Sequence, residues 1–167
     1  AYGLELAKSA DLLRRAARIA ADPSLARFLD SRADALLSND YAESDADWIR
    51  LQSDIELVFG PYETYEDRLF GYKATFESFV CYRIPEETAR LRRISRLAPE
   101  MQAALPLTDA MRRTCEPEQA SPFAVVDVLS TAGEARFGVQ TLAFVLPNDP
   151  DVISRFGTKK VMLRNIQ

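Results

Sequence analysis

The spacing of apolar residues changes from helical to alternating near residue 52, and this change restricts the fold more than any other feature. Before it, apolar residues recur every three or four positions, starting with Leu6, Ala10 and Leu13. After it, Ile55 to Phe59 alternate between apolar and other side chains, as in a half-buried strand. We therefore predict an α+β fold, in which a helical layer packs on a small mixed or antiparallel β-sheet or partial barrel.

Capping residues divide the leading region into helices. Asp22-Pro23 predicts an N-cap with proline in the first turn, and Asn39 predicts a left-handed stop. The run 44–47 predicts the start of a third helix, which carries Trp48 into the core. Short connections favour an antiparallel arrangement of these helices.

Turn residues divide the remainder into strands and helices. We expect Gly60-Pro61 to end the first strand and 131–134 to form a turn. Pro99 is expected to interrupt a helix over 85–104. The further elements predicted by period are strands at 76–82, 123–129, 137–146 and 160–163, and a short helix from Pro150 to Gly157. The strand near 138–146 is either an open edge of the sheet or an interior strand.

Size and charge exclude several classes of protein. The chain has 167 residues, 47% of them apolar, and a net charge of -4 without a basic block. These values predict one domain, residues 1–167, with a helical part at 1–52 and a sheet-plus-helix part at 53–167. They argue against nucleic-acid and membrane partners. We expect a soluble protein of the cytoplasm or periplasm, and the sequence does not choose between them.

Cysteine and histidine usage limits the chemistry. Cys81 and Cys115 lack the spacing of a metal-ligand pair, so we predict free thiols, at least one of them in the core. The chain has no histidine. A Ser-His-Asp triad, a Cys-His dyad or a histidine-ligated zinc therefore cannot be built from this chain alone, and we expect no cofactor or metal in it.

Two polar segments are candidates for a functional site. Glu63 and Tyr65 point to the same side if the backbone stays extended, and they suit an ammonium group and a carbonyl oxygen respectively. Asn148 follows a strand and offers a donor and an acceptor to a peptide backbone. The alternatives are a solvated polar loop for the first segment and turn or capping duty for Asn148.

Taken together, these segments resemble the dipeptidyl-peptidase III family of zinc metallopeptidases, in its divergent bacterial branch. The resemblance spans about 40–167 and depends on Gly60-Pro61-Tyr62-Glu63-Thr64-Tyr65-Glu66-Asp67 with Leu146-Pro147-Asn148. It implies a two-lobed exopeptidase that releases dipeptides from the N-termini of short peptides. The family's zinc ligands come from a His-Glu helix and a later glutamate. The resemblance thus implies a fragment upstream of that motif, with zinc and its lobe elsewhere in the parent protein.

The resemblance also implies roles for single residues. Tyr65 matches the family tyrosine that hydrogen-bonds the scissile carbonyl, and is the catalytic candidate. Glu63 matches a glutamate that receives the peptide's ammonium group, and Asn148 matches an asparagine near the peptide's amino end. Val145 stands where the family commonly has another substrate-binding asparagine. This departure puts standard peptide anchoring in doubt.

Three hypotheses follow for the function of the chain. The first is the substrate-binding part of a metallopeptidase, inactive when isolated. The second is a non-catalytic peptide-binding or interaction module. The third and weakest is an all-carboxylate hydrolase using Glu63 with Glu66 or Asp67, which would need these acids on opposing walls of a cleft.

Overall fold

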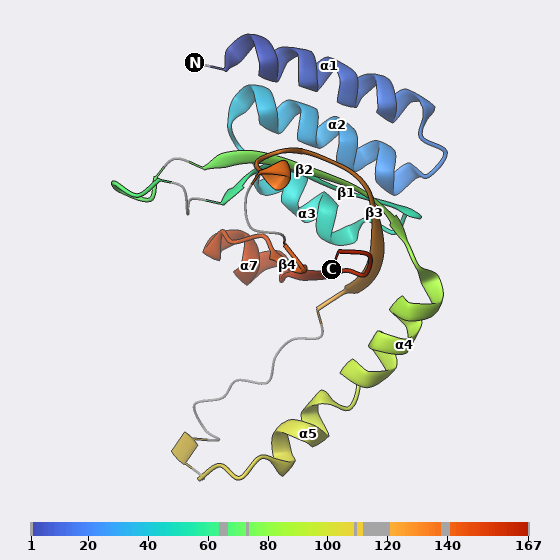
Figure 1. The fold of residues 1–167 in the computed structure, drawn as a ribbon, viewed down its shortest axis with the longest axis vertical. Coiled ribbons are helices and arrows are strands. Elements are labelled where there is room, and N and C mark those ends of the chain that lie inside the picture. Colours follow the sequence, from blue (N-terminus) through green and yellow to red (C-terminus); the bar gives the residue numbers. More distant parts are fainter. Residues whose placement is uncertain are drawn as a thin grey trace.

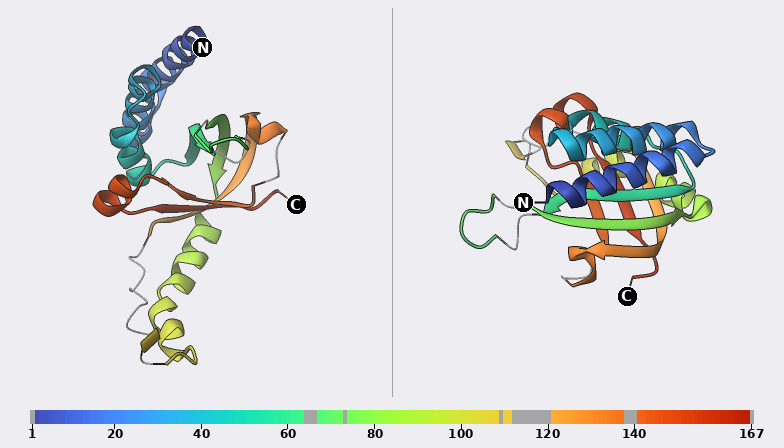
Figure 2. Two further views of the ribbon diagram at one scale, coloured as in Figure 1. Left: turned by 90° about the vertical axis from the view of Figure 1, so that its left-hand side faces the viewer. Right: turned by 90° about the horizontal axis from the view of Figure 1, so that it is seen from above.

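A helical layer lies on one side of a five-stranded sheet, and a helical arm extends from the sheet in the direction away from that layer (Figures 1 and 2). The computed structural model describes residues 2–63, 67–72, 74–108, 110–111, 121–137 and 141–166. The helices are α1 (Gly3–Ile19), α2 (Pro23–Ser38), α3 (Ala42–Arg50), α4 (Pro85–Ser95), α5 (Ala98–Ala104), η1 (Glu134–Arg136) and α7 (Pro150–Phe156). The strands are β1 (Ile55–Glu63), β2 (Thr75–Arg83), β3 (Phe123–Gly133), β4 (Ala143–Leu146) and β5 (Lys159–Leu163). The predicted α+β class is confirmed.

Local capping sets the boundaries of the helical layer. The Asp22 carboxylate accepts hydrogen bonds from the backbone N–H groups of Ser24 and Leu25 at 2.8 and 2.9 Å. Asn39 ends α2 in the left-handed conformation, with φ of 61°. Both predictions are confirmed. The predicted third helix is present, but α3 begins at Ala42, two residues before the predicted start, and it buries Ser44, Asp45 and Asp47.

The strand order is β1-β2-β3-β5-β4. Neighbours are antiparallel except β3 and β5, which are parallel, so the sheet is mixed. Among the described strands, β1 and β4 form the two edges. The predicted long strand at 137–146 is reduced to Ala143–Leu146, and 138–140 lie outside the described residues. The sequence left open whether this strand is an edge or an interior strand, and β4 lies at the edge.

The predicted strand end at Gly60-Pro61 is wrong. β1 continues through both residues to Glu63. Proline is tolerated there because β1 is an edge strand, so no second neighbouring strand requires the backbone N–H that proline lacks. The register shifts between Pro61, opposite Phe76, and Glu63, opposite Thr75. Tyr62 is therefore the inserted residue of a β-bulge, a feature that re-aims the side chains that follow it.

The predicted turn at 131–134 is also wrong, because β3 continues to Gly133. Gly133 has φ of 66°, and a Cβ there would lie 2.1 Å from the carbonyl oxygen of Phe76. Only glycine allows β3 to approach β2 this closely. The sequence signal for a turn was thus a signal for close strand packing.

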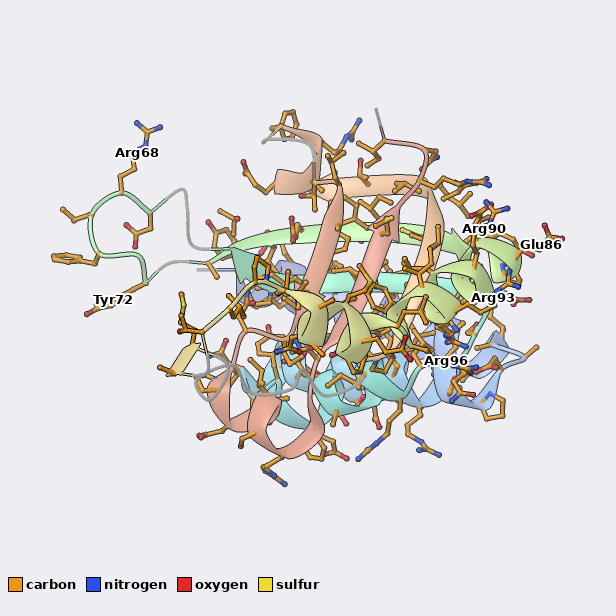
Figure 3. All side chains as sticks on the ribbon, turned by 90° about the horizontal axis from the view of Figure 1, so that it is seen from below. Arg68, Tyr72, Glu86, Arg90, Arg93 and Arg96 are labelled. Atoms are coloured by element: carbon orange, nitrogen blue, oxygen red, sulfur yellow. The ribbon has the colours of Figure 1, made fainter. Side chains whose placement is uncertain are left out.

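The helical arm consists of α4 and α5. The break predicted near Pro99 is confirmed, since α4 ends at Ser95 and α5 begins at Ala98. Figure 3 shows Arg90, Arg93 and Arg96 along the arm, and all three are exposed, as expected for a solvated basic face.

The core lies between α2, α3 and the facing side of the sheet. Trp48 and Cys81 are buried in it, as predicted, and Cys115 lies outside the described residues. The rings of Phe79 and Phe144 meet edge to face, with centroids 4.8 Å apart. Among the described residues, no helix combines the length and apolarity needed to cross a bilayer.

Candidate functional site

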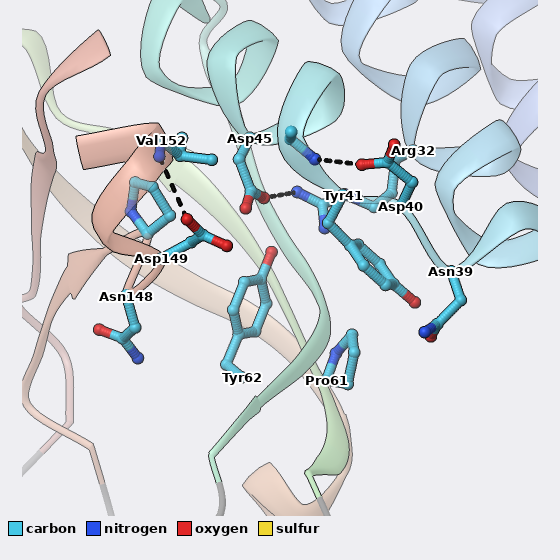
Figure 4. A pocket seen from close by; sticks show the side chains of 12 residues that line it. Arg32, Asn39, Asp40, Tyr41, Asp45, Pro61, Tyr62, Asn148, Asp149 and Val152 are labelled. Carbon is cyan, nitrogen blue, oxygen red and sulfur yellow. Dashed lines mark hydrogen bonds and ion pairs between the residues drawn. The ribbon is translucent and has the colours of Figure 1, made fainter. Parts of the chain in front are cut away.

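A pocket of about 350 Å³ opens where three segments far apart in the sequence converge (Figure 4). The first segment is the junction of α2 and α3, the second is the bulged end of β1, and the third is the turn between β4 and α7. The lining residues are Arg32, Asn39, Asp40, Tyr41, Ala42, Asp45, Pro61, Tyr62, Pro147, Asn148, Asp149 and Val152.

The pocket brings together the two segments that the sequence singled out. Asn148 is exposed and lines it. Glu63 is the last residue of β1, directly after the lining residue Tyr62, and its side chain is outside what the structure describes. Tyr65 and Glu66 lie outside the described residues altogether. The roles of Glu63, Tyr65 and Asn148 therefore remain predictions.

Asp149 and Asp67 have local structural duties. The Asp149 carboxylate caps α7 through the N–H groups of Asp151 and Val152, at 2.8 and 3.2 Å. The Asp67 carboxylate accepts from the N–H groups of Leu69 and Tyr72, at 3.1 and 2.9 Å, and holds the loop that carries Arg68 and Tyr72 away from the sheet (Figure 3). The all-carboxylate hydrolase stays untested, because Glu66 and the Glu63 side chain are not described.

Sequence reasoning missed Arg32. Its side chain is fully buried, and its Nη2 donates to Asp45 Oδ1 at 2.6 Å. Its guanidinium carbon lies 5.3, 5.2 and 5.7 Å from the ring centroids of Phe28, Tyr41 and Tyr62. A signal was present, because Arg32 stands four residues after Phe28 and four before Leu36, within the apolar stripe of α2.

Burial dominates the electrostatics of the pocket. It raises the pKa of Tyr62 to about 12, although the positive charge of Arg32 opposes the change. Burial also raises the pKa values of Asp45 and Tyr41, again against the influence of Arg32. The two tyrosines are thus neutral hydrogen-bonding groups at neutral pH and do not act as bases there.

The described residues do not supply a site for the zinc that the resemblance implies. Among the described residues, no group of three or more histidine, cysteine, aspartate or glutamate side chains could hold a metal ion. The sequence contains no histidine. A zinc centre would need ligands that this chain does not supply from its described part.

Comparisons with known proteins agree with this architecture. The model of peptidase family M49 matches residues 1–167. The solved structure of DPP III from Caldithrix abyssi is 47% identical, with a TM-score of 0.92 over 99% of this chain and 32% of that one. Dipeptidyl-peptidase III from Corallococcus sp. strain EGB is 43% identical, with a TM-score of 0.85 over 99% and 30%. The chain therefore spans about a third of the length of these structures.

A curated relative has a different name. Nudix hydrolase 3 of Arabidopsis thaliana is 40% identical over 162 residues, which is 97% of this chain and 21% of that protein. Its name describes a protein of which this chain matches about a fifth.

Proposed function

Because the chain belongs to peptidase family M49, we propose that it is the peptide-binding part of a longer exopeptidase that resembles dipeptidyl-peptidase III. One observation carries the proposal: the pocket joins Asn148, the end of β1 and the start of α7 beside the edge strand β4. In this proposal, Glu63 and Asn148 hold the amino end of a short peptide, and Tyr65 hydrogen-bonds the carbonyl to be cleaved.

The charge of the pocket favours an ammonium group. Three aspartates and one arginine line it, and the arginine is paired with Asp45. The carboxylates of Asp40 and Asp149 remain as excess negative charge at the pocket wall. An excess of one sign in a hollow attracts ligands of the opposite sign, and a free peptide N-terminus provides such a charge.

The edge strand supplies a backbone partner for an extended peptide. The N–H of Leu163 donates to the carbonyl of Leu142 at 2.9 Å, so these two residues form a hydrogen-bonded pair of the antiparallel ladder. Bonded and non-bonded pairs alternate, so Ala143 and Val145 direct their backbone groups away from β5. A peptide can add to these groups as a further strand.

This geometry changes the meaning of the departure at Val145. The side chain lacks the amide that the family commonly has there, but the backbone N–H and carbonyl do not depend on the side chain. We propose that main-chain pairing at β4 replaces part of the missing anchoring. Peptide hydrolysis itself would need the metal lobe of the parent protein, so the isolated chain should release no dipeptides.

Peptide binding to the chain, measured by titration calorimetry, tests the proposal. A short peptide with a free N-terminus should bind about 10- to 100-fold more tightly than its acetylated form, as expected for one charge-assisted hydrogen bond. Glu63→Gln should abolish this preference. Glu86→Gln, at an exposed position on α4, is the matched control and should retain it. Equal binding of free and acetylated peptides would contradict the proposal.

The parent reading frame separates this function from the alternative of a non-catalytic binding module. A His-Glu helix motif downstream of Gln167 supports the peptidase. Its absence, together with a preserved preference for free N-termini, supports the module.

A further inference from the structure

We propose that Arg32 is a positioning residue, which holds the bulged end of β1 in the place from which the strand leads into Glu63. The inference rests on the proposed function, since it concerns how the same peptide site is built. It assigns no direct contact between Arg32 and the peptide.

The first support is the way Arg32 is fixed. The guanidinium is fully buried, bonded to Asp45, and surrounded by the rings of Phe28, Tyr41 and Tyr62. A planar guanidinium stacks on aromatic faces and bonds a carboxylate at the same time. It therefore ties α2, α3 and β1 together at one point beside the pocket.

The second support is the contact with β1 itself. A Cβ added at Gly60 would lie 3.2 Å from Arg32 Nη1 and 3.3 Å from the ring of Tyr62. The missing side chain at Gly60 lets the guanidinium lie close to the strand just before the bulge. Tyr62, the inserted residue of that bulge, places its ring over the same guanidinium.

The bulge lies directly before Glu63, the last residue of β1. Side chains alternate along a strand, so one inserted residue changes the side to which later side chains point. Arg32 holds the ring of the inserted residue and approaches the residue two positions before it. Loss of Arg32 would let the bulge shift or relax without breaking the core of the sheet.

A contribution to stability alone does not explain why a buried guanidinium stands at position 32. Arg32 Nε and Nη1 find no hydrogen-bond acceptor among the described residues. A buried guanidinium with unpaired donors is costly, and an apolar side chain of similar volume is often as stable or more so. A charged, stacked group at this position suits the precise support of a neighbouring site.

The test compares Arg32 of α2 with Arg83, a largely buried arginine of β2. Arg32→Lys and Arg32→Met are measured beside Arg83→Met, which removes a largely buried arginine paired with Glu56 and absent from the pocket lining. The readout is the ratio of dissociation constants for the acetylated and free forms of one short peptide. Urea unfolding of each variant shows that the measurement is made on folded protein.

Both Arg32 variants should lower this ratio at least about fivefold, since small displacements of a positioned group weaken its interactions steeply. Arg83→Met should leave the ratio unchanged. Arg32→Lys keeps a positive charge for Asp45 but loses the planar guanidinium. If Arg32→Met does not fold, the ratio for Arg32→Lys alone tests the positioning role. An unchanged ratio in Arg32→Lys, or an equal fall in Arg83→Met, overturns the inference. A wild-type chain without any preference overturns the proposed function, and this inference with it.

Discussion

Two clusters of buried charged side chains lie near the two ends of β1, and they differ in how many of their polar atoms have hydrogen-bond partners. Near the start of β1, both oxygens of Glu56 are bonded, one to Lys159 Nζ at 2.6 Å and one to Arg83 Nη2 at 2.7 Å. The same two cations also donate to the backbone carbonyls of Trp48 and Leu51. Near the end of β1, Arg32 has Asp45 as its single described acceptor and faces the pocket.

The difference separates a structural cluster from one beside a site. The Glu56 cluster joins α3, β1, β2 and β5 within the core, and its carboxylate has no oxygen left for a ligand. Arg83 Nε is the one unpaired side-chain donor of the two cations that bind Glu56, whereas Arg32 has two, Nε and Nη1, among the described residues. The Arg32 cluster also lies next to the residues predicted to bind a peptide. We therefore expect substitutions in the first to change stability alone, and substitutions in the second to change both stability and binding.

The largest effect is expected for Glu56→Gln. This change leaves the buried Lys159 and the largely buried Arg83 without a carboxylate, and breaking a buried ion pair costs roughly 3 to 5 kcal/mol. The free energy of unfolding from urea titration measures it. Glu86→Gln, at an exposed position, should stay within about 0.5 kcal/mol of wild type. A loss below about 1 kcal/mol for Glu56→Gln would remove the distinction between the clusters.

The sequence predicted those parts of the fold that local chemistry decides. Asp22, Pro23 and Asn39 set the limits of α2 because capping involves only neighbouring residues. Gly60 was misread as a strand end and Gly133 as part of a turn, whereas these glycines allow close approach by Arg32 and by the Phe76 backbone. Contacts between distant segments leave no local signal of this kind.

The candidate site shows the same limit. Asn148 could be proposed from its place after a strand, but its proximity to the end of β1 depends on the crossover that puts β4 at the sheet edge. Arg32 carried a weak signal, a charge within an apolar stripe. Its partner Asp45 could not be foreseen, because an aspartate in the first turn of a helix is expected at the surface, whereas this one is buried.

A smaller loss of stability is expected for Asp45→Asn. The carboxylate is one partner of a single pair, and its side chain is 12% exposed, so water can reach part of the site. The guanidinium also keeps its three aromatic neighbours. We expect a cost of roughly 2 to 3 kcal/mol in urea unfolding. Asp34→Asn, in the exposed pair with Arg14, serves as the control and should change stability by less than about 1 kcal/mol.

The comparison between clusters would fail if Asp45→Asn proved as costly as Glu56→Gln. That result would mean that the pocket cluster carries as much of the fold as the core cluster. The difference in completeness of hydrogen bonding would then say nothing about function.

The smallest effect is a pH dependence that belongs to the Glu56 cluster. Burial lowers the pKa of Lys159 to about 8, although Glu56 opposes the change. Above pH 8 the folded chain gives up this proton while the unfolded chain keeps it, until the ordinary value of 10.5. The unfolded state then binds more protons, so this group makes the free energy of unfolding rise with pH, by at most about 1.4 kcal/mol per pH unit.

Urea unfolding between pH 8 and 9 isolates this contribution as the difference between wild type and Lys159→Met. Cys81 and Tyr62, whose pKa values burial raises to about 12, are present in both proteins and cancel in the difference. Arg32→Met removes a group that does not titrate in this range, so its difference from wild type should stay flat. A flat difference for Lys159→Met would show that attraction to Glu56 outweighs burial. The core cluster would then be a fully charged one like its counterpart at the pocket.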